Sequence, residues 1–216
     1  MIDAADPLWV PTASWVRQCF AAGTSRAMAD ALVVEPGLSG WQGALAQPDQ
    51  PLIPAAVLVP LVMRETGLTV LLTQRTAHLR DHAGQISFPG GRSEMTDASP
   101  EATALREAQE EVSLDPAQIE ILGRLPEYRT GTAFSITPVV ALVSPPLNLK
   151  LDDFEVAEAF EPPLGFLLDR NNHRRHKIEY QGAWREYYAM PWEGYYIWGA
   201  TAGMLVSLQR FLFVQG

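Results

Sequence analysis

Residues 71–114 constrain this chain more than any other segment, because they join a glycine-rich turn to an acidic helical pattern. Glu107, Glu110 and Glu111 recur at positions i, i+3 and i+4. On a helix, which advances ~100° per residue, these glutamates share one face. Three like charges on one face destabilise a bare helix. A divalent cation would remove that penalty, because hard cations prefer carboxylate oxygens as ligands.

The flanks of this helix support the same interpretation. We expect the opposite face, with Leu105, Ala108 and Val112, to pack on a core. Ser99 and Pro100 read as a capping serine followed by a proline at the first helical position. Residues 88–91, Phe-Pro-Gly-Gly, predict a tight turn whose glycines let the backbone approach a ligand closely. A turn with free carbonyl groups would then face three carboxylates, which is a plausible metal–diphosphate site.

This arrangement resembles the Nudix box, the loop–helix motif of Mg-dependent diphosphate hydrolases. The residues that carry the resemblance are Gly91, Asp97, Arg106, Glu107, Glu110, Glu111 and Leu114. The preceding segment is similar to the signature of the coenzyme A diphosphatase branch of that family, at Leu71, Leu72, Thr73, Arg75, Arg80, Gly84 and residues 88–91. Weaker similarity at residues 137–140, 155–156 and 198–203 extends the resemblance over residues 54–208.

A few positions depart from the family pattern. Ser113 replaces the last glycine of the box, and Thr76 stands where the branch signature has a smaller residue. Asp97 replaces a glutamate, and its spacing to Arg106 is one residue longer than the general pattern. These departures lie outside the metal-carrying glutamates, so we expect them to change the local loop geometry and not the chemistry.

The resemblance implies an α/β fold for residues 54–216, the Nudix α/β/α sandwich with a mixed sheet. The apolar runs and turn signals predict strands at residues 55–63, 69–75, 85–88, 119–125 and 135–143, and a hairpin at 176–180 and 184–189. They also predict helices at 100–112 and 197–213 and a short helix or turn at 163–168. Residues 1–53 predict an N-terminal extension, helical at 8–20 and 25–32 and then irregular.

By resemblance, Glu107, Glu110 and Glu111 bind Mg²⁺ or Mn²⁺, with the Gly91 carbonyl as a further ligand. Arg106 is expected to orient the glutamates, because a salt bridge to Glu110 joins positions one turn apart. The expected reaction is attack of water on one phosphorus of a diphosphate. It requires charge neutralisation, a positioned water and a base.

The resemblance leaves the general base open. It is either a glutamate of the box, Glu107 or Glu110, or an acid from a later loop. Glu155 is the later-loop candidate, because Glu155 and Val156 precede an apolar stretch as they do in these enzymes. Asp152 and Asp153 are its rivals.

Arg75 and Arg80 are candidates for contact with phosphate oxygens, since the planar fork of a guanidinium suits that task. A structural ion pair is the alternative for Arg75. Arg129, in a loop, is a further candidate, and Phe88 either packs beside the substrate or fills the core.

The histidines give no metal signature. His78 and His82 lack the glutamate of a zinc helix and are interpreted as surface residues. The cluster at residues 173–176, His-Arg-Arg-His, is interpreted as an exposed basic turn that could meet an anionic substrate tail.

Composition excludes several function classes. The net charge of −9, from 16 Lys and Arg against 25 Asp and Glu, gives no basic footprint for nucleic acid. Cys19 is the only cysteine, so no intrachain disulfide is possible. No secretory signal pattern opens the chain. The apolar segment 195–208 is shorter than the ~20 residues of a membrane span and is interpreted as a buried helix. We expect a cytoplasmic protein without a membrane partner. A homodimer is one expected assembly.

These observations predict hydrolysis of the diphosphate of coenzyme A or acyl-CoA, giving 3',5'-ADP and 4'-phosphopantetheine or its acyl form. The coenzyme A part depends on the branch signature alone. The alternatives are another nucleoside diphosphate derivative, such as ADP-ribose or NADH, and a ligand-sensing domain without catalysis on the same fold.

Overall fold

A computed structural model describes residues 10–23, 51–78, 83–130, 132–180 and 183–214. Its helices are α1 (Ala13–Gly23), α4 (Pro100–Val112), α5 (Leu164–Leu168) and α6 (Gly199–Val214), with 3-10 turns η1 (Pro116–Gln118) and η2 (Arg170–Asn172). Its strands are β1 (Ile53–Arg64), β2 (Gly67–Val70), β3 (Leu72–Arg75), β4 (Ile86–Ser87), β5 (Gly90–Arg92), β6 (Ile119–Arg124), β7 (Tyr128–Arg129), β8 (Phe134–Val143), β9 (Val156–Phe160), β10 (Arg174–Tyr180), β11 (Ala183–Trp192) and β12 (Tyr195–Trp198).

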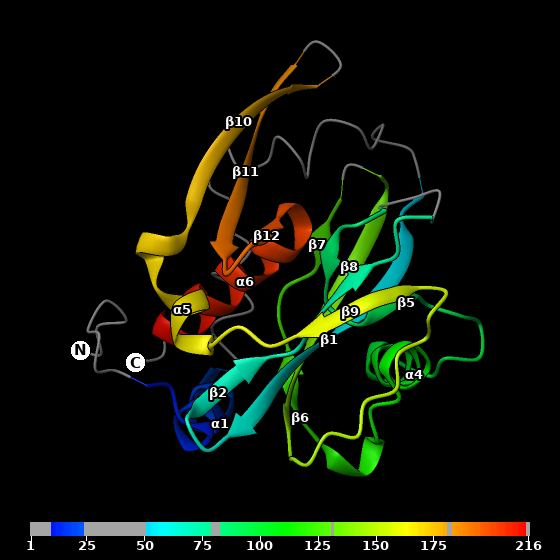
Figure 1. Ribbon diagram of the computed structural model, residues 1–216, viewed down its shortest axis with the longest axis vertical. Helices are drawn as coiled ribbons and strands as arrows, with labels where there is room; N and C mark the ends of the chain where they lie inside the picture. The colour runs from blue at the N-terminus through cyan, green and yellow to red at the C-terminus, as the bar shows by residue number, and fades with distance from the viewer. Residues whose placement is uncertain (1–9, 24–50, 79–82, 131, 181–182, 215–216) are drawn as a thin grey trace.

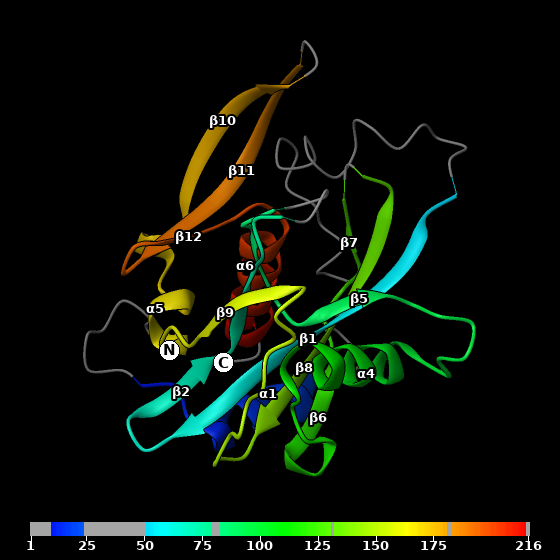
Figure 2. The ribbon, with the colours of Figure 1, turned by 45° about the vertical axis from the view of Figure 1, so that its right-hand side comes forward.

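A central mixed sheet forms the middle layer, with strand order β2-β1-β8-β6 and with β5 and β7 paired to β1 and β8. β1 and β8 run parallel and the other pairs are antiparallel. Because side chains alternate along a strand, β1 sends Ala56 and Leu58 toward α4, and Val57 and Val59 into the core that contains α1 and α6. Figures 1 and 2 show α4 on one side of the sheet and α6 on the other. The predicted α/β/α sandwich is confirmed.

The predicted strand at 69–75 is wrong as a single strand. Val70 pairs with β1, whereas Leu72 pairs with Phe160 of β9 in a second sheet of order β4-β3-β9. The switch occurs at Leu71, whose N–H donates to the Pro60 carbonyl over 3.1 Å. A run of apolar residues cannot reveal this change of partner. Its consequence is that Arg75 lies in the second sheet, next to β9.

The C-terminal third forms a third sheet and the longest helix. The predicted hairpin is confirmed as β10 and β11, which project from the body above α6 (Figure 2). The predicted start of the last helix is wrong, because Ile197 lies in β12 and pairs with Met190. Gly199, at φ 65°, lets the chain turn from β12 into α6. Among the described residues, no helix is long and apolar enough to cross a membrane.

The predicted N-terminal helix is present as α1. Thr12 starts it, since its Oγ1 accepts a hydrogen bond from the Trp15 N–H at 3.2 Å. Val16 and Phe20 are buried, and the Cys19 thiol donates to the Leu212 carbonyl of α6 at 3.6 Å. Cys19 thus has a packing role. The second predicted helix, at 25–32, lies outside the described residues.

Candidate active site

Helix α4 begins and ends at the predicted residues. The Ser99 Oγ accepts a hydrogen bond from the Ala102 N–H at 3.3 Å, and Pro100 follows it. At the other end Ser113 adopts the left-handed conformation, φ 54° and ψ 37°, at the position where the family box has glycine. Serine therefore closes this helix in the glycine conformation, and its N–H bonds back to the carbonyls of Ala108 and Gln109.

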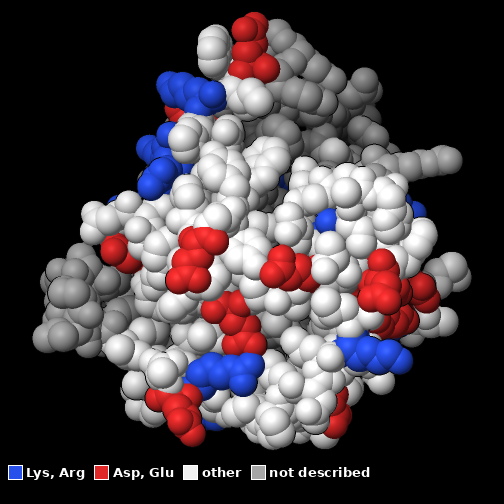
Figure 3. All heavy atoms as spheres, in the orientation of Figure 1, with Lys and Arg blue, Asp and Glu red and all other residues white. Residues whose placement is uncertain are grey.

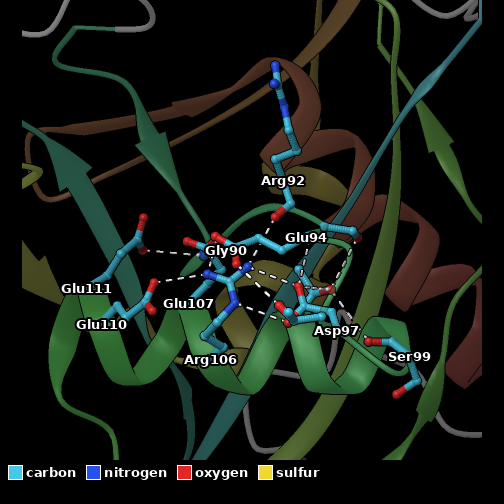
Figure 4. A network of polar contacts seen from close by, with 12 residues as sticks. Gly90, Arg92, Glu94, Asp97, Ser99, Arg106, Glu107, Glu110 and Glu111 are labelled. Atoms are coloured by element: carbon cyan, nitrogen blue, oxygen red, sulfur yellow. Dashed lines mark hydrogen bonds and ion pairs between the residues drawn. The ribbon is translucent and has the colours of Figure 1, made fainter.

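Arg106 lies at the centre of the polar contacts in Figure 4. Its guanidinium contacts Glu107 and Glu110 at 2.9 Å each, which confirms the predicted salt bridge to Glu110. It also donates two 3.1 Å hydrogen bonds to Asp97 and one to the Arg92 carbonyl. These bonds lower the pKa of the Asp97 carboxyl well below its ordinary value. Arg106 thus fixes the box loop and the helix relative to each other.

The glycine turn is a short strand. β5 pairs antiparallel with β1, with Gly90 opposite Val57 and Gly91 opposite Ala56. A Cβ on Gly91 would lie 2.6 Å from the Glu107 carboxylate, so the end of that side chain would have to move. A Cβ on Gly90 would lie 2.5 Å from the Ala56 carbonyl oxygen. Gly90 thus lets β5 lie close to β1, and Gly91 leaves space for the Glu107 side chain of α4.

The strand register corrects the predicted carbonyl ligand. The Leu58 N–H bonds to the Pro89 carbonyl and the Ser93 N–H to the Pro54 carbonyl. In an antiparallel ladder alternate residues make these bonds, so Gly91 bonds to Ala56 and its carbonyl is engaged by β1. Gly90 instead points its backbone toward α4, and its N–H donates to Glu111 at 3.3 Å. The backbone group that faces the glutamates belongs to Gly90 and not to Gly91.

The three glutamates differ in burial. Glu110 is 61% exposed at its side chain, Glu107 17% and Glu111 5%. Glu111 thus lies at the border of the buried face that holds Ala108 and Val112, which the helical wheel had set opposite to it. Burial, with a further contribution from the charges of Glu107 and Glu155, raises the pKa of Glu111 to about 8. Burial is also the largest cause that raises the pKa of Glu107.

Arg75 and Glu155 complete this acidic centre. The Arg75 guanidinium lies 3.8 Å from Glu111 and 3.6 Å from Glu155, so it bridges α4 and the start of β9. Thr76 holds the two segments together, since its Oγ1 donates to the Phe154 carbonyl at 2.8 Å and its N–H to the Glu155 carbonyl at 2.9 Å. This contact accounts for threonine at a position where the branch signature has a smaller residue.

The donor set of this centre suits a hard divalent cation. The charge of Glu155 helps to raise the pKa of both Glu107 and Glu111, and Glu111 is buried against a guanidinium at 3.8 Å. Added positive charge would stabilise their ionised forms. Among the residues that the structure describes, no three acidic or histidine side chains already converge as metal ligands. Glu110 in particular turns toward Arg106.

The remaining predicted site residues lie elsewhere. Phe88 is 1% exposed within the core, so the prediction of substrate contact is wrong and the ring fills the core. Arg129 is exposed on β7, where it pairs with Ser135 of β8. Arg80 and His82 lie outside the described residues. Asp152 accepts from the Phe154 N–H at 2.9 Å as a turn residue, and Asp153 is exposed.

The glycine strand β5 thus lies against the acidic helix α4, with Arg75 and Glu155 beside them. The chain belongs to the Nudix family, because the NUDIX domain model matches residues 52–179. It is 43% identical over 155 residues to the uncharacterized Nudix hydrolase NudL of Escherichia coli strain K12, across 71% of this chain and 80% of that protein. The NudL protein of Shigella boydii serotype 18 shows the same identity and coverage. The chain is thus a Nudix hydrolase.

Solved structures with a similar arrangement include the NUDIX domain of Shewanella oneidensis NrtR complexed with ADP ribose. It has a TM-score of 0.47 and 20% identity, and the match covers 76% of this chain and 90% of that one. A second solved structure, a C. elegans Ap4A hydrolase binary complex, has a TM-score of 0.45 and 21% identity, and the match covers 51% of this chain and 80% of that one.

Proposed function

We propose that this chain hydrolyses the diphosphate of coenzyme A or acyl-CoA to 3',5'-ADP and 4'-phosphopantetheine or its acyl form. The observation that carries the proposal is the position of Arg75. It belongs to the segment that resembles the coenzyme A branch signature, and it lies 3.8 Å from Glu111 and 3.6 Å from Glu155. One residue of the signature segment, Arg75, therefore lies in the acidic centre.

Glu107 and Glu111 would hold Mg²⁺ or Mn²⁺, with the Gly90 carbonyl in place of the Gly91 carbonyl. Glu110 would join them by leaving Arg106, which its 61% exposure permits. The cation supplies charge neutralisation to the diphosphate and lowers the pKa of a bound water. Arg106 is a positioning residue, because it bonds to Asp97 and to both glutamates that flank it on the helix surface.

Arg75 and Glu155 would then act on the substrate. The guanidinium of Arg75 binds phosphate oxygens when the diphosphate takes the place of its carboxylate partners. Glu155, 43% exposed at its side chain, accepts the proton of the attacking water. Glu107 is the candidate base if Glu155 fails the test below.

A substrate panel tests the proposal. Purified protein with Mg²⁺ or Mn²⁺ is given coenzyme A, dephospho-coenzyme A, ADP-ribose and NADH, and the products are read by mass spectrometry. An enzyme built for coenzyme A holds its 3'-phosphate with a cation, which contributes ~1.5–3 kcal/mol, or roughly 10- to 100-fold in kcat/KM over the dephospho form. A preference for ADP-ribose contradicts the coenzyme A assignment, and the Nudix hydrolase assignment then stands.

The role of Glu155 has its own test. Glu155→Gln is expected to lower kcat with little change in KM, because a base acts in the transition state and contributes little to ground-state binding. Glu65→Gln is the matched control, since Glu65 is exposed in the turn between β1 and β2. Equal kcat in the Glu155→Gln variant and the wild type would move the base to Glu107.

A further inference from the structure

Glu155 lies in a surface turn that has little side-chain packing of its own. Asp152 and Asp153 are exposed, and Phe154 is 66% exposed. A segment with few buried contacts depends on hydrogen bonds for a fixed position. One such bond joins the turn to α4, since the Asp152 N–H donates to the Glu111 carbonyl at 2.9 Å. The position of the Glu155 carboxylate therefore depends on the bonds that join this turn to its neighbours.

Thr76 holds both peptide groups that flank the Glu155 Cα. Its Oγ1 donates at 2.8 Å to the Phe154 carbonyl, which belongs to the peptide group before that Cα. Its N–H donates at 2.9 Å to the Glu155 carbonyl, which belongs to the peptide group after it. Because each residue has only two soft backbone dihedral angles, bonds to both flanking groups fix the direction in which the Glu155 side chain leaves the backbone.

The regular pairing of β3 with β9 is interrupted next to this contact. The register shifts between Gln74 and Arg75, so that Ala157 of β9 has no partner in β3. A β-bulge of this kind bends its strand and redirects side chains. The two bonds of Thr76 follow this irregular step. They, and no regular ladder, therefore determine where Glu155 lies.

We propose that Thr76 is a positioning residue that keeps the Glu155 carboxylate beside Arg75, where it accepts the proton of the attacking water. This inference rests on the proposed role of Glu155 as the base and not on which diphosphate is hydrolysed. The Arg75 guanidinium lies 3.6 Å from Glu155, and Thr76 follows Arg75 directly, so the turn is fixed next to that contact. A base must lie within hydrogen-bond reach of its water, and a displacement of ~1 Å can lower the rate ~100-fold.

Removal of the Thr76 hydroxyl tests this role. Thr76→Val keeps the shape of the side chain and the backbone N–H but loses the bond to the Phe154 carbonyl. On the best substrate of the panel, kcat is expected to fall by about tenfold or more, with KM changed less than ~twofold. Thr76→Ser keeps the hydroxyl and should keep kcat within ~threefold of the wild type.

Thr201→Val is the matched control for this variant. Thr201 is 5% exposed, and its Oγ1 donates to the Ile86 carbonyl at 2.8 Å, so the substitution removes the same kind of buried bond from α6. It should lower the melting temperature about as much as Thr76→Val does. It should nevertheless leave kcat within ~twofold of the wild type, because the lost bond does not hold Glu155.

Two further measurements separate positioning from a general loss of structure. In the Glu155→Gln background, Thr76→Val should lower kcat by less than ~twofold, since the carboxylate that it positions is gone. Hydrogen exchange of the peptide that spans residues 152–156, measured without metal and substrate, should be about tenfold faster in Thr76→Val. The same peptide should be unchanged in Thr201→Val.

The inference is overturned if Thr76→Val keeps wild-type kcat, if it lowers kcat by the same factor in both backgrounds, or if the exchange of residues 152–156 does not change. Equal impairment of Thr76→Ser and Thr76→Val also contradicts it, because the hydroxyl is then not the cause. Wild-type kcat in Glu155→Gln contradicts the proposed base together with this inference. An impaired Glu155→Gln without coupling to Thr76→Val contradicts the inference alone.

Discussion

Helices α4 and α6 cover opposite faces of one sheet, yet their contacts differ in range along the chain. On α4, Arg106 bonds to Glu110, 4 residues away, and to Asp97, 9 residues away. On α6, Thr201 bonds to the Ile86 carbonyl, 115 residues away, and Leu212 accepts from Cys19, 193 residues away. The acidic centre is thus largely encoded in one contiguous segment, whereas the position of α6 depends on contacts between segments far apart in the sequence. In Figure 3 basic side chains gather at the upper left, where Figure 1 places β10.

The largest expected effect is a loss of turnover from substitutions in α4. Glu111→Gln keeps the side-chain shape and the acceptor for the Gly90 N–H but removes a carboxylate charge. We expect turnover to fall by at least ~100-fold, as for the loss of one electrostatic stabiliser. We expect the turnover of the Glu110→Gln variant to fall by a similar factor, because the exposed Glu110 side chain is also a proposed metal ligand. Steady-state kinetics with Mg²⁺ measures both.

The matched control for these variants is Glu65→Gln, in the exposed turn between β1 and β2. It should keep wild-type turnover. Circular dichroism must show that all three variants are folded. Near-normal turnover in folded Glu111→Gln would remove the metal assignment from α4, and near-normal turnover in Glu110→Gln alone would leave Glu110 as a partner of Arg106 only.

The sequence predicted the α4 side well where contacts are local. The Ser99 cap and the Arg106–Glu110 salt bridge follow from spacing along a helix, and both are present. Whether Gly90 or Gly91 turns its carbonyl toward α4 could not be predicted, because it depends on the register of β5 on β1, whose residues lie 33 to 37 positions earlier. The burial of Phe88 depends in the same way on the core around it.

Prediction was poorer wherever a strand changes partner. The break at Leu71 falls within an apolar run that continues without a turn signal, and the strand β12 at Ile197 was taken into the predicted last helix. Residues 173–176 were interpreted as a basic turn, but Arg174, Arg175 and His176 lie in β10, whose partner strand β11 follows later in the chain. One signal for the strand was in the sequence, since Gly199 follows Trp198 and interrupts the proposed helix.

The next expected effect concerns packing on the α6 side. A Cβ on Gly203 would lie 2.6 Å from Cε2 and 2.7 Å from the hydroxyl oxygen of Tyr128. That ring is held in place by its surroundings, and burial raises the pKa of Tyr128 to about 12. Gly203→Ala is therefore expected to lower the free energy of unfolding by ~1–3 kcal/mol through overpacking. Urea unfolding measures the loss.

Gly199→Ala distinguishes crowding from backbone strain in this prediction. At Gly199 an added Cβ meets nothing within 4 Å, but φ is 65°. Its cost should be the ~1–2 kcal/mol of the left-handed conformation alone.

In the Gly203→Ala background, Tyr128→Leu should recover part of the lost unfolding free energy, which is measured as a coupling energy. If Gly203→Ala and Tyr128→Leu change the free energy of unfolding additively, the Gly203–Tyr128 contact does not limit the approach of α6.

The smallest expected effect is electrostatic and belongs to α4 alone. Glu101 bonds to Arg124 of β6 at 2.6 and 2.7 Å, whereas α6 has no acidic residue in its first turn. The side-chain bond to Arg124 is the largest cause that lowers the pKa of Glu101 from 4.5 to about 2. A carboxyl group whose pKa is lower in the folded state stabilises the fold above its unfolded pKa, and this stability is lost as pH falls through the folded pKa.

The pH window of this effect therefore runs from 4.5 down to about 2. Because the Arg124 side chain is 44% exposed, solvent screening limits the contribution of the pair to ~0.5–1 kcal/mol. Glu101→Gln should lower the free energy of unfolding by that amount near neutral pH and by progressively less below pH 4.5, measured by urea unfolding at several pH values. Glu120→Gln is the matched control. It breaks the Arg17–Glu120 pair between α1 and β6, in which both side chains are at least 44% exposed, so it should lower the free energy of unfolding by less. A difference between wild type and Glu101→Gln that stays constant through this window would show that Glu101 stabilises α4 by packing and not by its charge.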